Sequence, residues 1–381
     1  MSEDSTRFVG MDVHKETIVV AVARQGTEPP ESWGTFANTE AGVRKLVARL
    51  GSTDWVFCTY EAGPTGYALL RQLQGLGVSC SVTAPSLIPI KAGDRVKTDR
   101  RDAIKLARLL RAGELTSVWV PDTATAALRD LTRARAAAQK NVVEAKNQLG
   151  KFLLRLAVAP PAGLRPWSAG YRTWLRQLVL SQPLQQLVLD EAHTAVVETE
   201  ARVTRLEGAL ATAPLSPRQV AAIKALQTLR GVGLVTATAL VAEIGDFTRF
   251  ERPRQLMAYA GVVPSESSSG SRVRRGSITK SGNAQLRAVV VESAQHYRHK
   301  PHVGWQLKAR QRGQAAPVLG IAAKAQQRLY RRYWRLVSRN GKSSQQAVVA
   351  VGRELLGFIW AVGREVAERT APSGSATTTA A

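Results

Sequence analysis

The chain has 381 residues, of which 44% are hydrophobic, and this is enough for two or three domains with hydrophobic cores. Lys and Arg outnumber Asp and Glu by 53 to 29, and the formal net charge of +24 indicates a polyanionic partner, usually a nucleic acid. The start has no signal-peptide pattern and no run of eighteen apolar residues exists, which argues against a membrane protein. Two isolated cysteines, Cys58 and Cys80, indicate a reducing compartment rather than a zinc site. We therefore expect a cytoplasmic, nucleoid-associated protein.

Strands and helices alternate over the first 120 residues. The predicted strands are 8–13, 17–23, 33–36, 55–60 and 78–82. Helices are expected after Asn38, which is a candidate N-cap for a helix that ends near Leu50, and over residues 67–76. This alternation predicts an α/β domain over residues 1–120.

A helix that begins near residue 98 carries two acids in a strongly basic region. In the stretch VKTDRRDAIKL, Asp99 and Asp102 lie about one helical turn apart on one face. Between Lys91 and Arg111 there are eight Lys or Arg and only three acids. Two like charges at this spacing repel each other by about 0.2–0.5 kcal/mol on an exposed helix. Either the neighbouring cations neutralise the pair on a solvated face, or a divalent cation binds both acids. The neighbouring cations are Lys97, Arg100 and Arg101, and in the second case we expect them to face the nucleic acid.

Two further acids occur where strands are predicted. Asp12 lies in the strand VGMDV, and Glu61 closes the strand that starts at Trp55. Each alone is typical of a solvated strand end. With Asp99 and Asp102 they give the order Asp, Glu, Asp, Asp, which is typical of an RNase H-like domain, where two neighbouring strands and a later helix bring acids together. Two Mg²⁺ ions about 3.5–4 Å apart would there bind the attacking and leaving oxygens of a phosphodiester, with Mn²⁺ as an alternative ion.

Long helices are predicted from residue 121 onward. Residues 123–157 have apolar residues at helical spacing, and a looser stretch, 158–183, leads to a second helix over 184–212. Two long antiparallel helices form an arm that is typical of coiled-coil dimerisation, and we assign residues 121–213 to such a linker. Its basic residues either line a solvated face or contact phosphates, and we favour phosphate contact.

Residues 214–368 are predicted to form a helical domain, followed by a disordered tail over 369–381. The expected helices include 253–260, 283–297, 317–338 and 343–366. Earlier in this domain, Gly231 and Gly233 form a turn between two helices. Such a turn either receives a phosphate on its amides or is an ordinary tight connection.

A polar loop over residues 261–282 is rich in serine and in cations. The serines are Ser265, Ser267, Ser268, Ser269, Ser271, Ser277 and Ser281, and the cations are Arg272, Arg274, Arg275 and Lys280. The loop either binds phosphate flexibly or carries a nucleophilic serine. A nucleophilic serine needs a base or a metal ion for activation and cations that stabilise the transition state. No histidine is local, so activation would have to come from metal held by the distant carboxylates.

Residues 305–340 contain nine Lys or Arg and no acid. Tyr330, Tyr333 and Trp334 recur at helical spacing in this region, which is more often a sign of core packing. The surrounding arginines still favour a nucleic-acid-binding face. They are Arg328, Arg331, Arg332 and Arg335.

Five motifs occur in an order that is specific to one family. They are GMDVHKETIVVAV, YEAGPTGY, KTDRRDA, LRGVGLVTATALVAEIGDFTRF, and LMAYAGVVPSESSSG with ITKSGNAQLR. Over about residues 7–365 the chain resembles the IS-one-ten family of insertion-sequence transposases, which includes the Piv-type DNA invertases.

The resemblance implies a RuvC-like (RNase H-like) domain, a coiled-coil linker and a helical transposase domain with a catalytic serine. The family's four acids fall on Asp12, Glu61, Asp99 and Asp102, and its serine, just before a glycine, falls on Ser269. By this likeness Ser269 attacks the scissile phosphate and holds the DNA strand covalently, with metal assisting. The implied partners are donor and target DNA, a structured bridge RNA that guides the enzyme, and further copies of the chain in dimers and tetramers.

Three other functions remain open at this point. A RuvC-like junction nuclease that uses metal-activated water would explain the four acids but not the serine loop. A DNA invertase would use the same residues on a different arrangement of sites. A non-enzymatic scaffold for DNA or RNA would explain the net charge and little else.

Overall fold

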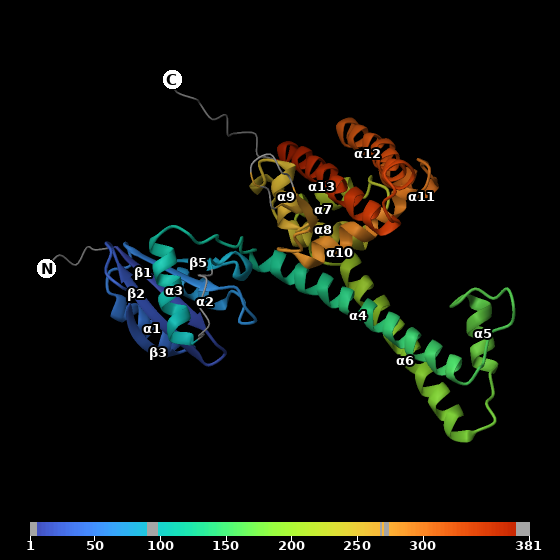
Figure 1. The fold of residues 1–381 in the computed structure, drawn as a ribbon, viewed down its shortest axis with the longest axis horizontal. Coiled ribbons are helices and arrows are strands. Elements are labelled where there is room, and N and C mark those ends of the chain that lie inside the picture. Colours follow the sequence, from blue (N-terminus) through green and yellow to red (C-terminus); the bar gives the residue numbers. More distant parts are fainter. Residues whose placement is uncertain (1–5, 90–97, 267–268, 270–273, 371–381) are drawn as a thin grey trace. The chain divides into compact units, whose positions relative to one another are not determined.

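A computed structural model describes residues 6–89, 98–266, 269 and 274–370, and it divides into two compact units at Pro121 (Figure 1). The predictions for Lys97, Arg272, Ser267, Ser268 and Ser271 lie outside the described residues, as do the side chain of Arg275 and most of the tail expected over 369–381. Residue 369 of that stretch is helical rather than disordered.

The first unit contains a five-stranded mixed sheet in the order β3-β2-β1-β4-β5. The strands are β1 (Arg7–Val13), β2 (Thr17–Arg24), β3 (Glu31–Ala37), β4 (Val56–Glu61) and β5 (Ser79–Thr83). The strands β1, β2 and β3 are antiparallel neighbours, whereas β4 runs parallel to both β1 and β5. This arrangement agrees with the RNase H-like domain that the order of the acids predicts.

Helices cover both faces of this sheet. On one face α1 (Glu40–Leu50) and α2 (Ala68–Gly75) bury leucine and valine side chains against the strands. Thr39 caps α1 by accepting a hydrogen bond from Gly42, so the expected N-cap, Asn38, is wrong by one residue. Asn38 instead donates to the backbone oxygen of His14 at 2.8 Å.

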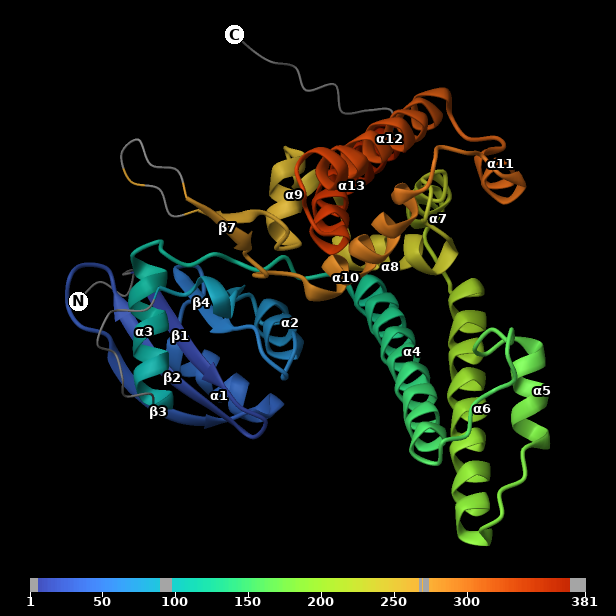
Figure 2. The same cartoon turned by 45° about the vertical axis from the view of Figure 1, so that its right-hand side comes forward.

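The other face packs against α3 (Asp99–Arg111) through very small residues (Figure 2). Ala103 and Ala107 of α3 lie against Ala21 and Ala23 of β2. A Cβ atom placed on Gly10 of β1 would lie only 2.2 Å from the Ala103 oxygen. The backbones of β1 and α3 therefore approach so closely that only glycine, which has no side chain, fits at this position.

Two long helices open the second unit. They are α4 (Thr123–Arg155) and α6 (Pro183–Ala211), and they run antiparallel, because Leu128 packs near Leu210 while Leu149 packs near Leu189. Within the stretch expected to be loose, the structure has a further helix, α5 (Ala169–Gln177), which Ser168 caps. Its apolar residues, Tyr171 and Leu175, close the core at the far end of α4.

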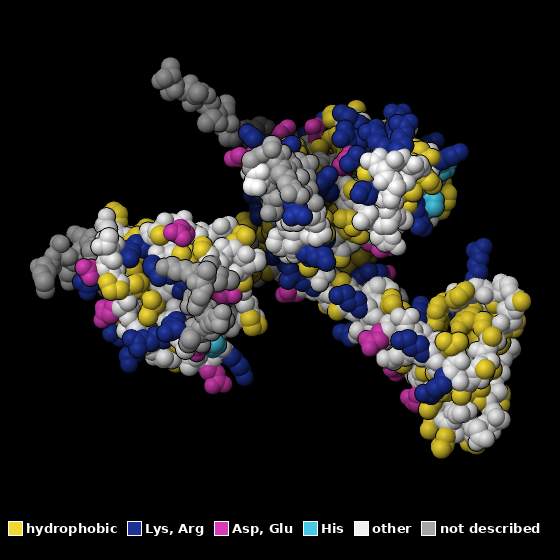
Figure 3. Space-filling model, viewed as in Figure 1, with side chains coloured by type: hydrophobic (Ala, Val, Ile, Leu, Met, Phe, Trp, Pro, Cys, Tyr) yellow, Lys and Arg dark blue, Asp and Glu magenta, His cyan; other side chains and the backbone are white. Residues whose placement is uncertain are grey.

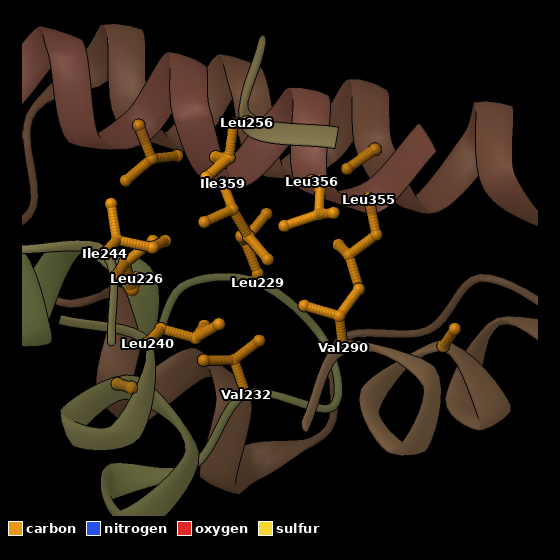
Figure 4. Packing of buried hydrophobic residues seen from close by; sticks show 14 of the residues in the cluster. Leu226, Leu229, Val232, Leu240, Ile244, Leu256, Val290, Leu355, Leu356 and Ile359 are labelled. Atoms are coloured by element: carbon orange, nitrogen blue, oxygen red, sulfur yellow. The ribbon is translucent and has the colours of Figure 1, made fainter. Parts of the chain in front are cut away.

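The rest of this unit is mainly helical, with one short hairpin. It contains α7 (Pro217–Leu226), α8 (Leu234–Ile244), α9 (Pro253–Tyr259), α10 (Ala284–Ala294), α11 (Trp305–Gln311), α12 (Ala316–Trp334) and α13 (Ser344–Arg369). By length and composition α13 could cross a membrane. Its buried residues, among them Leu355 and Ile359, instead pack with α7, α8 and α10 in the core (Figure 4). We therefore interpret α13 as a core helix.

One buried carboxylate joins the long helices to this core. Glu243 on α8 is 1% exposed, and both its oxygens accept hydrogen bonds from Arg133 on α4, at 2.7 and 2.9 Å. Asn283 donates to the same carboxylate at 2.7 Å, and Arg129, also buried, lies 3.6 Å away. Burying an ion pair is favourable only when its groups are fully hydrogen-bonded, and these contacts meet that condition.

Candidate functional site

Two acids and a histidine lie together at one edge of the first unit. Asp12 is near the end of β1, His14 follows in the turn to β2, and Asp99 is the first residue of α3. Thr98 caps α3 by accepting from the backbone of Arg101 at 3.3 Å. This cap fixes where the helix begins and so places Asp99 and Asp102 in its first turn, where the helix dipole favours acids by about 0.3–1 kcal/mol.

The histidine bridges the two acids. His14 Nε2 lies 3.4 Å from Asp12 Oδ2 and 3.3 Å from Asp99 Oδ2. Among the described residues, these three form a close group of potential metal ligands, with the ligand atoms within 4.8 Å of one another. Partial burial raises the pKa of Asp12 above its ordinary value; the charges of Asp99 and Asp102 raise it further, and His14 lowers it. Negative charge is thus concentrated here, and a bound cation would relieve it.

Glu61 faces the same region without joining the close group. It is the exposed last residue of β4, one position beyond the Met11–Tyr60 pair, and therefore in register with Asp12. A surface hollow of about 630 Å³ is lined by Asp12, His14 and Glu61, together with the Gly63-Pro64 turn. The structure thus brings Asp12, Asp99 and Asp102 together and places Glu61 on the wall of the same hollow.

From the sequence, His14 was expected only as part of a turn. The spacing of the two residues could have predicted its place in the site. Side chains two residues apart in an extended chain project to the same side, so His14 lies on the same face as Asp12. The hydrogen bond from Asn38 to the His14 oxygen then holds the turn in place. What the chain order did not reveal is that His14 also reaches Asp99.

This set of side chains suits a divalent cation. Carboxylate oxygens are the ligands that Mg²⁺ and Mn²⁺ prefer, and the open hollow leaves room for water and a substrate phosphate. An imidazole nitrogen is a ligand that borderline transition metals accept more readily than Mg²⁺ does. The donor set therefore fits a divalent ion but does not select Mg²⁺ alone.

The serine loop of the second unit contains a short hairpin rather than an unstructured loop. Its strands are β6 (Pro264–Glu266) and β7 (Arg275–Ile278), with Pro264 paired to Ile278 and Glu266 to Arg275. Ser265 donates from its hydroxyl to the Ser277 backbone oxygen, so it has a structural role in the hairpin. Ser269 lies beyond the Glu266–Arg275 pair and is exposed.

The cations of the basic helix α12 are partly neutralised. Arg328 and Arg332 each lie 3.0 Å from a Glu354 oxygen on α13. These three residues line a surface hollow of about 400 Å³, together with Arg331 and Arg335. Lys and Arg side chains gather over α12 in Figure 3. Of the aromatic residues in this region, Tyr333 is buried in the core and Trp334 is partly exposed.

The Gly231–Gly233 turn packs against other parts of the second unit. A Cβ atom on Gly231 would lie 2.6 Å from the Ser293 oxygen. Arg310 donates to the Val232 oxygen at 2.7 Å. These contacts favour the tight-connection interpretation over a phosphate site.

Comparison with known proteins identifies relatives over most of the chain. A model described as "Transposase IS116/IS110/IS902 family" matches residues 223–308, and a DEDD transposase model matches residues 9–157. A protein of Sinorhizobium fredii that is named as a transposase is 44% identical over 365 residues, which cover 95% of this chain and 90% of the relative. The transposase for insertion sequence element IS1533 of Leptospira borgpetersenii is 29% identical, covering 88% of this chain and 98% of the relative. The pilin gene-inverting protein of Moraxella bovis is 22% identical, covering 95% and 97%.

Proposed function

This chain belongs to the IS116/IS110/IS902 family of insertion-sequence transposases, and from that premise we propose that it recombines DNA through a covalent phosphoserine, guided by a structured RNA. The observation that supports the proposal best is the close approach of Asp12 and Asp99, from a strand and a helix 87 positions apart, around His14. Membership of the family makes DNA the substrate, and the inverting relatives make site-specific inversion an alternative outcome of the same chemistry.

In this proposal four carboxylates hold the divalent ions. Asp12 and Asp99 would supply oxygens from the close group, Asp102 one from the same helical turn as Asp99, and Glu61 one from the wall of the hollow. When bound, Mg²⁺ or Mn²⁺ neutralises the phosphate and favours an ionised hydroxyl. His14 contacts both Asp12 and Asp99 and holds their oxygens close to each other.

Ser269 is the proposed nucleophile. Its exposed hydroxyl attacks the scissile phosphorus, so that an Oγ–P bond forms while one P–O bond to deoxyribose breaks. Attack by a hydroxyl of a second strand then reverses the step and releases the serine. The cations of this loop, including Arg274 and Lys280, stabilise the charge on the phosphorane.

The guide RNA and the assembly complete the proposal. The net charge of +24 supports binding of RNA as well as DNA, because both carry a phosphate backbone. The long helices α4 and α6 expose apolar side chains toward solvent, among them Leu154, Leu184 and Leu187. We assign to this arm a coiled-coil contact between copies, which builds dimers and then tetramers.

The deciding experiment is a trap for the covalent intermediate. The full chain, incubated with co-purified RNA, donor and target DNA and Mg²⁺, is denatured in detergent, and the adduct is mapped by mass spectrometry. We expect an adduct on Ser269 that is lost in Ser269→Ala and retained in the control variants Ser267→Ala and Ser268→Ala. Asp12→Asn and Asp99→Asn are expected to abolish the adduct and to weaken Mn²⁺ binding measured by paramagnetic resonance.

Three results would contradict the proposal in different ways. Metal-dependent cutting without any adduct would identify a nuclease that uses activated water. An adduct on another residue would retain the recombinase but reject Ser269. Recombination that proceeds undiminished after ribonuclease treatment would reject RNA guidance alone.

A further inference from the structure

A hollow of about 460 Å³ lies between the β6–β7 hairpin and the first turns of α13. Its volume is within the range of about 300–1,000 Å³ that is typical of small-ligand sites. One wall is the paired base of the hairpin, Pro264 and Ile278. The opposite wall is the α13 face that carries Val349 and Ala350, so the hollow is bounded by two different elements of one unit.

The interior of this hollow is largely apolar. Ile278 and Val349 face it from the two walls, and the buried side chain of Leu336 forms part of the floor. A flat apolar group that covers this surface would stabilise the complex by about 25 cal/mol for each Å² of apolar area removed from water. A ligand made only of charged groups would leave this surface uncovered.

The rim of the hollow is cationic. Lys280, Lys342 and Arg353 line it, and its lining contains no acid. Within the described part of the chain, none of the three forms an ion pair with a carboxylate. The hollow on α12 is different, because Glu354 there pairs with Arg328 and Arg332. The cations of the hairpin hollow thus keep their charge available for an anionic ligand.

The backbone that carries one of these cations is held in a strained conformation. Lys280 has φ = 55°, a value that residues with a Cβ rarely adopt, and its amide donates to the Gly261 oxygen at 3.0 Å. Gly261 itself has φ = 65°, and a Cβ there would lie 2.0 Å from the Ser281 oxygen. Strain of about 1–3 kcal/mol persists where the surroundings enforce it, and it is concentrated at binding and catalytic sites.

We propose that this hollow holds one unpaired nucleotide of the DNA strand, with the base between Ile278 and Val349 and the phosphate on the cationic rim. A nucleotide combines flat apolar faces with a negative charge, which is the combination that the hollow offers. The inference rests on the proposed recombinase function and adds to it a subsite for the substrate.

The position of Ser269 limits how far along the strand the bound nucleotide lies from the scissile phosphate. Ser269 is five residues from Pro264, and five extended residues reach at most about 18 Å. Stacked nucleotides advance about 3.4 Å along a strand. The bound nucleotide therefore lies within about five positions of the phosphate that Ser269 attacks.

The test uses the full chain and single-stranded oligonucleotides that carry 2-aminopurine at successive positions. Anisotropy reports total binding, and the emission of the analogue reports the surroundings of one base. We expect a change in emission confined to one or two positions relative to the cut site. Ala350→Leu, which fills the hollow, should remove this change and weaken binding about 5- to 10-fold, whereas Ala361→Leu, on α13 outside the hollow, should retain both. Lys342→Ala should weaken binding and lower the salt slope by about 1, whereas Arg339→Ala in the same connection should leave the emission change intact.

Failure of this inference differs from failure of the proposed function. One result is an emission that changes equally at all analogue positions while oligonucleotide binding and the Ser269 adduct persist. This result would overturn the nucleotide subsite only. A change of oligomeric state in Ala350→Leu, with unchanged emission, would also overturn it and assign the hollow to a second copy. The absence of any strand binding would overturn both.

Discussion

Replacing Glu243 by alanine is expected to destabilise the second unit by about 3–5 kcal/mol. The carboxylate is almost fully buried and accepts two hydrogen bonds from Arg133 and one from Asn283. The substitution leaves the buried Arg129 and Arg133 without this carboxylate. Loss of one partner from a buried ion pair lowers the free energy of unfolding by about 3–5 kcal/mol. For a unit of this size, the cost corresponds to a fall of about 6–20 °C in the melting temperature.

The measurement is thermal and urea unfolding of the full chain, followed by circular dichroism. The matched control is Glu207→Ala, because Glu207 pairs with Arg135 on the same long helix but is 39% exposed. Exposed pairs contribute about 0–1 kcal/mol, so this variant should unfold close to the wild type. If Glu243→Ala lowered the free energy of unfolding no more than Glu207→Ala does, the argument from burial and hydrogen bonding would be refuted.

Three further predictions follow from other parts of the chain. Gly10→Ala is expected to lose about 1–3 kcal/mol in urea unfolding because α3 must move outward; Gly75→Ala, in a helix with open space around it, should be neutral or slightly stabilising. Hydrogen bonds and charge from Arg172 and Lys146 lower the pKa of Glu200 from 4.5 to about 2, so Glu200→Gln should cost up to about 3 kcal/mol at pH 7. Because this carboxylate stabilises the fold only while ionised, the difference from the wild type should narrow as the pH falls below about 4.5; a constant difference would contradict the assignment. Binding of DNA and RNA should weaken steeply with salt, since each phosphate contact releases counterions, and a flat dependence between low and moderate salt would argue against the basic surfaces as the contact area.

Much of the first unit could be predicted from the sequence because its strands are long β-branched runs. The ends of β1, β2 and β4 lie within one residue of the expected limits. The positions of Asp12 and Glu61, in or at the end of predicted strands, also identified them as acids that neighbouring strands could bring together. The approach of His14 to Asp99 could not be predicted, since it depends on how closely α3 packs on the sheet.

The second unit was predicted less completely for a different reason. Two short helices, α5 and α11, contain fewer than three full turns, and such segments give a weak helical period. The hairpin around Ser269 has strands of three and four residues in a serine-rich stretch without alternating hydrophobicity. Its pairing is instead supported by contacts such as the Ser265–Ser277 hydrogen bond, which sequence patterns do not report.

The close packing of Gly10 against Ala103 has a consequence for the ion selectivity of the proposed metal site. Asp12 is carried by the sheet and Asp99 by the helix, so the gap between their oxygens follows the gap between the two backbones. Mg²⁺ requires ligand distances of about 2.0–2.1 Å, whereas Ca²⁺ accepts about 2.3–2.6 Å. A single methyl group at Gly10 would therefore move the site toward the larger ion without altering any ligand. Residues that carry no charge and touch no metal can in this way determine which cation the acids hold.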